Sequence, residues 1–231
     1  MAKSYAVTNM KAKPKFIIIS GIDGSGKTTI IDAVKDRLED KGVQSQYIWL
    51  RYNHIIIKPV HALCRLVGLS KRYDSIQGKV WRHEFYKSQS FCSIYIFLTW
   101  LDTWLGRFKI TWRLRGINVD VVICDRWVND ILIDLAVDSR RDKFLESRWR
   151  DWFQRILPDN AQSFLITRHV EDVLGCRPEC RDDPDFEFRQ RAYRQLQESS
   201  PNLIVLSNDG SIEQAVNTLL DQLDDFDRRL A

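Results

Sequence analysis

The stretch Phe16-Ile17-Ile18-Ile19-Ser20-Gly21-Ile22-Asp23-Gly24-Ser25-Gly26-Lys27-Thr28 decides the fold of this chain. Residues 16–20 form a short apolar run followed by a glycine, which is typical of a buried parallel strand. Residues 21–28 match the pattern G-x-x-x-x-G-K-[ST], in which glycines allow backbone conformations that other residues resist. The pattern predicts a P-loop, whose backbone N–H groups and following helix N-terminus together cradle phosphate oxygens.

The loop and a later strand together predict a site for a nucleotide and its metal ion. Lys27 is expected to reach the β- and γ-phosphates, and the hydroxyl of Thr28 is expected to bind Mg²⁺. Residues 121–124 form another apolar run, which Asp125 follows directly. A carboxylate at the end of a neighbouring strand can hold Mg²⁺ directly or through water, so Asp125 is the second predicted metal ligand.

Strand-like and helix-like segments alternate along the whole chain. Apolar runs predict strands at residues 16–20, 46–50, 119–124, 161–166 and 203–206. Helices are expected at residues 28–41, after Pro59 as far as Gly68, at 79–115 with a break near Gly106, and at 129–137, 143–156, 185–197 and 211–227. The alternation predicts a single α/β domain of the P-loop NTPase fold over residues 1–231, with a five-stranded parallel sheet and helices on both faces.

Three segments are expected to lie outside this regular framework. Residues 1–14 are typical of a flexible lead-in, and residues 71–78 are polar and loop-like. Residues 168–185 are rich in Arg, Asp and Pro, so most of this segment is predicted to form a mobile loop. Such a loop can act as a lid that closes over the site and excludes water.

Composition gives no sign of a nucleic-acid or membrane partner. The formal charge is +4, from 35 basic and 31 acidic residues, which is too small an excess to favour DNA, RNA or a membrane surface. No segment reaches the ~18 apolar residues that a membrane-spanning helix needs. The five cysteines are irregularly spaced and no signal peptide is recognised, so we expect a reduced, cytoplasmic protein.

Several arginines favour a kinase over other nucleotide-binding proteins. A GTPase would need a guanine-reading Asn-Lys-x-Asp motif, which the sequence lacks. Arg126 directly follows Asp125, at the edge of the sheet where ligands gather. Arg177 and Arg181 lie in the lid, where guanidinium groups suit phosphate oxygens and can stabilise the transferring group. We therefore expect ATP, Mg²⁺ and a small-molecule acceptor as ligands.

Taken together, these motifs resemble the thymidylate kinase family. The similarity is most specific at residues 16–29, including the Asp-Gly pair inside the loop and the two threonines after the lysine. Asp125-Arg126-Trp127 is similar to the family's Asp-Arg-Tyr element, and residues 185–193 and 203–216 resemble its later helices and last strand. The resemblance is weak between residues 52 and 115. It implies ATP-dependent phosphoryl transfer to a nucleoside monophosphate, and a homodimer formed through the long helices.

On the acceptor side, the resemblance implies roles for four residues and shows two departures. Asp23 would contact the acceptor's sugar hydroxyl, and Arg126 its phosphate. The family's Arg-Glu-Pro run is replaced by residues 50–53, of which Arg51 is expected to keep a phosphate contact. Phe97 or Leu98 falls near the family's base-stacking phenylalanine, but Asp102 stands at about the position where the family reads thymine with an arginine. Asp102 either favours a donor-rich acceptor or does not face the pocket.

On the donor side, the resemblance implies that the catalytic arginine comes from the lid, because Gly24 stands where some members carry it in the loop. It also implies that Asn208 packs near the adenine. The candidate catalytic residues are therefore Lys27, Asp125, Arg126, Arg177 and Arg181. The candidate ATP-binding residues are Gly21, Gly24, Ser25, Gly26, Lys27, Thr28, Thr29 and Asn208, and the candidate metal ligands are Thr28 and Asp125.

Two alternatives remain open from the sequence. The departures on the acceptor side are compatible with a kinase for another small acceptor that carries a phosphate or a hydroxyl group. A regulatory module that binds a nucleotide without catalysis would also need the loop. The presence of Lys27, Asp125, Arg126 and the lid arginines argues against this second alternative.

Overall fold

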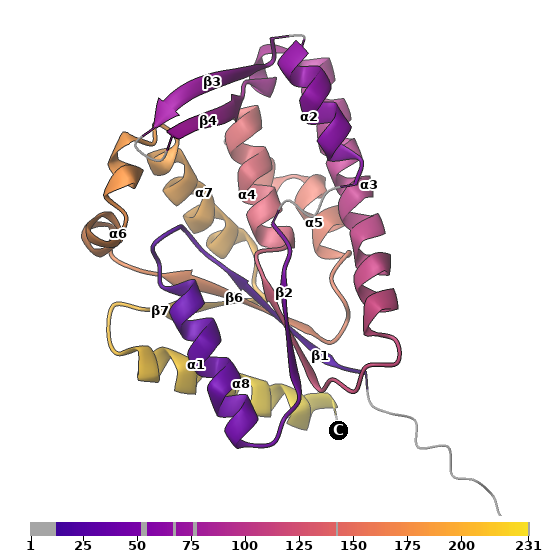
Figure 1. The fold of residues 1–231 in the computed structure, drawn as a ribbon, viewed down its shortest axis with the longest axis vertical. Coiled ribbons are helices and arrows are strands. Elements are labelled where there is room, and N and C mark those ends of the chain that lie inside the picture. The colour runs from indigo at the N-terminus through magenta and orange to yellow at the C-terminus, as the bar shows by residue number, and fades with distance from the viewer. Residues whose placement is uncertain (1–12, 52–54, 67, 76–77, 142, 231) are drawn as a thin grey trace, which may run out of the picture.

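The computed structural model of the chain describes residues 13–51, 55–66, 68–75, 78–141 and 143–230. Residues 1–12 of the predicted lead-in lie outside this range. The main sheet contains five parallel strands in the order β2-β5-β1-β6-β7, with bounds β1 Lys15–Ser20, β2 Ser45–Trp49, β5 Val121–Asp125, β6 Ala161–Thr167 and β7 Leu203–Ser207 (Figure 1). This sheet confirms the prediction of a five-stranded parallel sheet.

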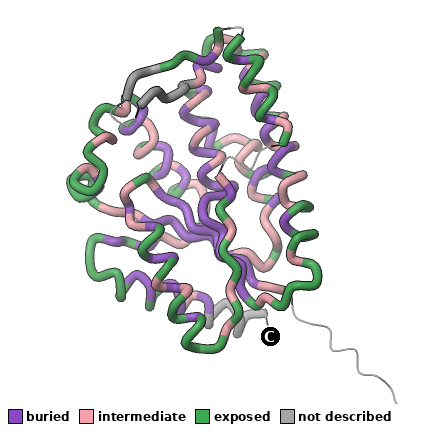
Figure 2. The backbone as a smooth tube through the Cα atoms, viewed as in Figure 1, coloured by how far each residue is buried: buried purple, intermediate pink, exposed green. Residues whose placement is uncertain are grey.

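The central strands are apolar throughout because both of their faces are covered. Every residue of β1 and β5 is buried, as expected for parallel strands between two layers of helices (Figure 2). Successive side chains of a strand point to opposite faces. Phe16 and Ile18 therefore join the hydrophobic core on one face, whereas Ile17 and Ile19 join the core on the other.

Helices form a layer on each face, as predicted. The Ile17 face packs against α1 (Lys27–Asp40) and α8 (Ile212–Leu230). The opposite face packs against α3 (Gln89–Leu114), α4 (Val128–Ser139), α5 (Arg148–Gln154) and α7 (Phe186–Ser199). A capping box opens α8, since the Ser211 hydroxyl accepts the Gln214 N–H at 3.2 Å and the Gln214 side chain accepts the Ser211 N–H at 3.4 Å. No helix within the described residues is long and apolar enough to cross a membrane.

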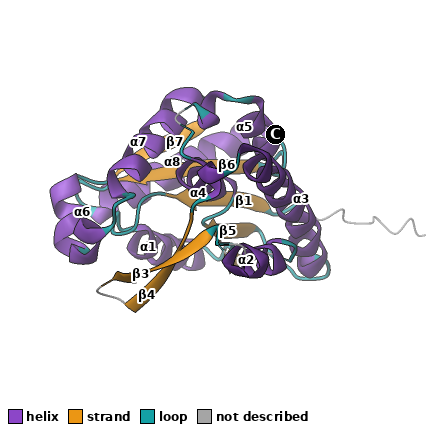
Figure 3. Cartoon of the chain, turned by 90° about the horizontal axis from the view of Figure 1, so that it is seen from above, coloured by secondary structure: helices purple, strands orange, loops and turns teal. Residues whose placement is uncertain are grey.

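The prediction of a loop at residues 71–78 is wrong. After α2 (Ile57–Leu66), strands β3 (Ser70–Ser75) and β4 (Gly78–His83) form an antiparallel ribbon. The ribbon is separate from the main sheet and projects beyond it (Figure 3). A strand outside the main sheet need not show the apolar alternation that identifies a half-buried strand, so a polar sequence of this kind predicts a loop instead.

The long helix also differs from its prediction. It begins at Gln89, where the Ser88 side chain caps it by accepting the Phe91 N–H, and it continues through Gly106 without a break. A glycine inside a helix costs only about 1 kcal/mol relative to alanine. Burial of Thr103 and Ile110 on either side of Gly106 offsets that cost.

The predicted lid at residues 168–185 contains more regular structure than expected. It consists of α6 (Val170–Cys176) and a 3-10 turn at Pro178–Asp182. Acidic residues in the first turn of α6 suit the helix dipole. Arg177 has an extended φ of −135°, as the residue before a proline prefers, and the helix ends there. The prediction that most of this segment is a loop is therefore wrong, since α6 and the turn cover twelve of its residues.

Candidate functional site

Two loops meet at the carboxyl edge of the main sheet, where the strand order reverses. From β1 the chain leads to β2 on one side, whereas from β5 it leads to β6 on the other side of β1. In parallel α/β sheets, ligands bind outside the carboxyl ends of the strands at this switch point. The loop after β1 (residues 21–26) and Arg126, which follows β5, both lie there (Figure 1).

Glycines shape the loop after β1 because no other residue fits. Gly21 and Gly26 have φ angles of 147° and 90°. A Cβ atom on Gly21 would lie 2.5 Å from the carbonyl oxygen of Ile166, and one on Gly26 would lie 2.2 Å from Nδ2 of Asn208. Asn208 also donates a hydrogen bond of 2.9 Å to the carbonyl oxygen of Ser25. Asn208 is thus brought to the loop, where it contacts the backbone, and its expected place near the adenine stays a prediction.

Lys27 folds back over the loop. Its Nζ atom donates to the carbonyl oxygens of Gly21 at 2.8 Å and Ile22 at 2.6 Å, and the side chain is almost fully buried. Burial and the nearby Arg126 guanidinium lower the pKa of Lys27 to about 8, although Asp23 and other carboxylates oppose the shift. Two neutral carbonyl oxygens therefore hold the ammonium group at the loop, and they compete only weakly with an anionic ligand for its hydrogen bonds.

The first turn of α1 is open to a ligand. Its N-cap residue, Gly26, provides no side-chain cap, so no capping side chain occupies the N–H groups of this turn. Thr28 and Thr29 are exposed in the same turn, whereas Ser25 is buried and its hydroxyl has no hydrogen-bond partner among the described residues. The turn thus presents N–H groups and hydroxyls at the positively polarised end of a 14-residue helix.

Asp125 is the last residue of β5, and one of its two carboxylate oxygens has a hydrogen-bond partner among the described residues whereas the other has none. Its Oδ2 atom accepts a hydrogen bond of 2.9 Å from the hydroxyl of Tyr47 on β2. Its Oδ1 atom is buried and has no hydrogen-bond partner in the described part of the chain. Burial and the bond to Asp125 raise the pKa of Tyr47 to about 12, so the phenol remains a donor. An unpartnered buried oxygen is costly unless a ligand, water or ion satisfies it.

These donors fit a nucleotide-bound Mg²⁺. Within the described residues, no group of three or more His, Cys, Asp or Glu side chains could form an all-protein metal site. Mg²⁺ bound to nucleotide phosphates needs only one or two protein oxygens and keeps several waters. The exposed Thr28 hydroxyl and the spare Oδ1 of Asp125 are oxygens of that kind.

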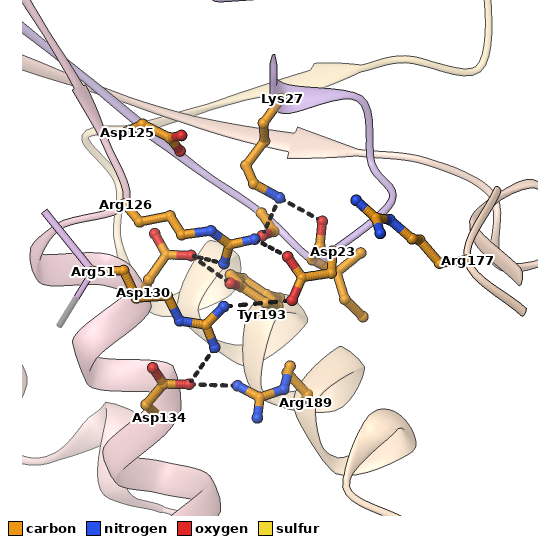
Figure 4. A network of polar contacts seen from close by, with 12 residues as sticks. Asp23, Lys27, Arg51, Asp125, Arg126, Asp130, Asp134, Arg177, Arg189 and Tyr193 are labelled. Atoms are coloured by element: carbon orange, nitrogen blue, oxygen red, sulfur yellow. Dashed lines mark hydrogen bonds and ion pairs between the residues drawn. The ribbon is translucent and has the colours of Figure 1, made fainter. Parts of the chain in front are cut away.

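Arg126 adopts a strained backbone conformation. Its φ of 58° lies in the left-handed region, which a non-glycine residue enters at a cost on the order of 1 kcal/mol. Its N–H donates to the carbonyl oxygen of Ile19 at 2.9 Å, which ties the loop after β5 to the end of β1. The conformation directs a buried guanidinium toward Asp23 in the loop and Asp130 on α4 (Figure 4).

Beneath the loop, arginines and carboxylates form two layers (Figure 4). In the upper layer, Oδ1 of Asp130 accepts from Arg126 at 3.1 Å and from the hydroxyl of Tyr193 at 2.7 Å. In the lower layer, Oδ1 of Asp134 accepts from Arg51 at 3.5 Å and from Arg189 at 2.5 Å. Helix α4 supplies both carboxylates, and α7 supplies both Tyr193 and Arg189.

Asp23 joins the two layers from above. Its carboxylate pairs with Arg126 and, at 3.4 Å, with Arg51. Burial raises the pKa of Asp23, but Arg126, Lys27, Arg51 and Arg189 together lower it below its ordinary value. The Asp23 side chain is 55% exposed, whereas those of Arg126 and Arg51 are 9% and 17% exposed. One exposed carboxylate thus bridges two well-buried guanidinium groups.

The lid contacts the loop at Gly24. A Cβ atom there would lie 3.0 Å from Cγ of Arg177 and 3.2 Å from Cγ1 of the buried Val173. Arg177 thus packs against the loop, and its guanidinium pairs with Glu179 in the lid at 3.4 Å (Figure 4 shows its position). Arg181 is exposed in the Pro178–Asp182 turn. Of the two predicted lid arginines, Arg177 is the one seen at the loop.

The structure does not bring Phe97 to this site. Its ring is 47% exposed and stacks on Trp100, with centroids 6.0 Å apart, on the side of α3 that faces α5. Asp102 does not face the site either. Its carboxylate accepts the N–H groups of Ile55 and Ile56 at 2.9 Å and caps the start of α2. The expected base-stacking position of Phe97 therefore does not lie beside the loop, and Leu98, the other residue near that position, packs partly buried against the core.

Sequence reasoning missed five residues of the network: Tyr47, Asp130, Asp134, Arg189 and Tyr193. A signal for two of them was present, because Asp130, Asp134 and Asp138 recur every four residues in an otherwise apolar helix. Carboxylates on a buried helical face are rare unless they are paired. Tyr47, Arg189 and Tyr193 gave no such signal.

Comparison with known protein families finds no family model that matches this chain, and comparison with curated proteins finds no significant match.

Proposed function

We propose that this protein is a P-loop kinase, similar to thymidylate kinases, that transfers the γ-phosphoryl group of ATP to a nucleoside monophosphate. One observation carries the proposal. A glycine-shaped loop with a buried lysine lies directly beside two buried arginines that share one exposed carboxylate. The two features suit a phosphoryl donor and a phosphorylated acceptor that meet at the same edge of the sheet.

On the donor side, Lys27 transfers its hydrogen bonds from backbone carbonyl oxygens to phosphate oxygens when ATP binds. The carbonyl oxygens of Gly21 and Ile22 accept hydrogen bonds from its ammonium group. Anionic phosphate oxygens compete well against neutral carbonyls, because charge-assisted hydrogen bonds are roughly twice as strong. The N–H groups of the loop and of the uncapped α1 hold the remaining phosphate oxygens. Thr28 and Asp125 would hold a nucleotide-bound Mg²⁺, which would neutralise charge on the phosphates.

On the acceptor side, Asp23 stands in for an anionic ligand. Its carboxylate bridges Arg126 and Arg51 in the way a phosphate group bridges two guanidinium groups. Because Asp23 is the exposed partner, its carboxylate is the group that moves away from the two arginines when an acceptor phosphate binds. The freed carboxylate then becomes an acceptor for a sugar hydroxyl of the same ligand.

The chemical step needs only positioning and charge stabilisation. An oxygen of the acceptor's phosphate forms a bond to the γ-phosphorus, and the bond from that phosphorus to the β–γ bridging oxygen breaks, so ADP leaves with the electron pair. Lys27 and Arg177 offset charge on the transferring group, and the lid excludes water that would otherwise hydrolyse ATP. No covalent enzyme intermediate is required.

A second candidate is a kinase for a different small phosphate-bearing acceptor. It is favoured by the positions of Phe97 and Asp102, since neither side chain lies where the thymidylate kinase resemblance needs a base contact. The guanidinium pair would serve this acceptor equally well. The base, if there is one, would then be read by other residues.

An ADP-release assay tests the proposal. Wild-type protein is supplied with ATP, Mg²⁺ and a panel of nucleoside monophosphates, with the corresponding nucleosides as controls. We expect release that depends on a monophosphate, reduced by orders of magnitude in Lys27→Ala, because the lost ammonium stabilises the transferring group. Acceptor-independent release, or near-normal turnover in Lys27→Ala with an unchanged circular dichroism spectrum, would sink the proposal.

A further inference from the structure

Helix α7 follows directly after the lid and reaches both acceptor-side arginines through carboxylates. Tyr193 hydrogen-bonds to Asp130, which holds Arg126. One helical turn earlier, Arg189 pairs with Asp134, which holds Arg51. Residues four apart lie on one helical face, so both contacts come from a single face of α7. In each contact, a side chain of α7 binds a carboxylate of α4 that in turn holds an arginine.

Because these groups are buried, the position of each carboxylate depends on the side chain of α7 that donates to it. Asp130 is 2% exposed and Tyr193 is 7% exposed. A buried carboxylate that loses one hydrogen-bond donor is left with an unmet acceptor, and the guanidinium it holds loses a fixed partner. The hydroxyl of Tyr193 and the guanidinium of Arg189 therefore fix where Asp130 and Asp134 lie, and hence where the arginines point.

The same stretch of chain also touches the donor side. Val173 and Arg177 of the lid pack against Gly24, and the chain then turns through Pro178–Asp182 into α7. Arg140 on α4 pairs with Asp185, the N-cap residue of α7, and so fastens the start of this helix. Residues 170–199 thus connect the loop at Gly24 to the carboxylates beneath Arg51 and Arg126.

We propose that Tyr193 and Arg189 are positioning residues, through which α7 orients the Arg126–Arg51 pair to receive the acceptor's phosphate. This inference rests on the proposed function, because it assumes that a phosphate group replaces Asp23 between the two arginines. Neither residue touches the phosphate in this role. Each acts on it through one carboxylate and one arginine.

The test separates phosphate binding from ATP binding and from folding. The complex of the full chain with Mg²⁺ and a non-hydrolysable ATP analogue, which fills the loop, is titrated with inorganic phosphate in a calorimeter. The variants are Tyr193→Phe and Arg189→Gln. Their matched controls are Tyr86→Phe and Arg194→Gln, two exposed residues away from the network.

We expect the Kd for phosphate to rise about five- to tenfold in Tyr193→Phe and Arg189→Gln, as the loss of one buried hydrogen bond or ion pair predicts. The Kd for the ATP analogue should stay unchanged, and the controls should match wild type in both. Arg189→Lys, which keeps the positive charge beside Asp134, should restore most of the phosphate affinity. This rescue would not occur if only the shape of the arginine mattered.

Three results would overturn the inference. The first is an unchanged phosphate Kd in both variants. The second is a parallel loss of phosphate and ATP-analogue binding with a lower unfolding midpoint, which would mean a general structural role. The third is no phosphate binding by wild type even at high concentration. Failure of every monophosphate as a substrate, with the expected phosphate binding intact, would instead count against the proposed kinase reaction alone.

Discussion

At Lys27, burial disfavours the charged form of the ammonium group, whereas its hydrogen bonds stabilise that form. Two backbone carbonyls of the loop hold it in place, yet its burial and the proximity of Arg126 disfavour the charge. Active sites often keep such groups because a ligand relieves the cost. Arg126 shows the same feature in its backbone, where a left-handed φ is maintained by the contacts around it.

The lowered pKa of Lys27 predicts a pH dependence of stability. Its folded pKa is about 8, against 10.5 for the ordinary side chain, so between these values the unfolded chain binds more protons. The free energy of unfolding of wild type, measured relative to Lys27→Met, should therefore rise as the pH increases from 8 to 10.5. Urea denaturation of both proteins across this range measures the difference. A difference that is flat or falls with pH would contradict the burial of a charged Lys27.

At the scale of elements, the sequence predicted well wherever a local pattern decides the structure. The five main strands and α1, α4, α7 and α8 follow from apolar runs, capping residues and the glycine-rich loop. The β3–β4 ribbon could not be predicted because it lies outside the main sheet and needs no apolar face. In the site, Lys27, Asp125 and Arg126 could be identified from local motifs. The pairing of Asp134 with Arg189 depends on how α4 packs against α7, which no local pattern encodes.

The cap that Asp102 provides for α2 gives a prediction at this scale. Asp102→Ala should lower the free energy of unfolding by about 1–2 kcal/mol, because three N–H groups lose their acceptor: those of Ile55 and Ile56, just before α2, and that of Ile57, its first residue. Asp102→Asn is the matched control, since its amide oxygen can still cap the helix. Chemical denaturation gives the stabilities, and the acceptor KM should stay unchanged in both variants. A large change in acceptor preference with unchanged stability would return Asp102 to the acceptor pocket.

At the scale of the whole molecule, α3 leaves a row of large aromatic side chains exposed. Trp104, Phe108 and Trp112, spaced four residues apart, are 40%, 56% and 72% exposed. The resemblance to thymidylate kinases implies a dimer through this helix, and we expect these side chains to lie in its interface. Sedimentation velocity should therefore find a dimer for wild type and a monomer for Trp112→Glu. A wild-type monomer at high micromolar concentration would be the contrary result.

The central claim is that a γ-phosphoryl group moves from ATP to an acceptor that carries a phosphate. Phosphorus NMR of a mixture of wild-type protein, ATP, Mg²⁺ and a nucleoside monophosphate follows every phosphate at once. The account predicts that the resonance of the monophosphate declines while those of ADP and a nucleoside diphosphate grow in equal amounts. Growth of ADP matched only by inorganic phosphate, for every monophosphate supplied, would contradict it.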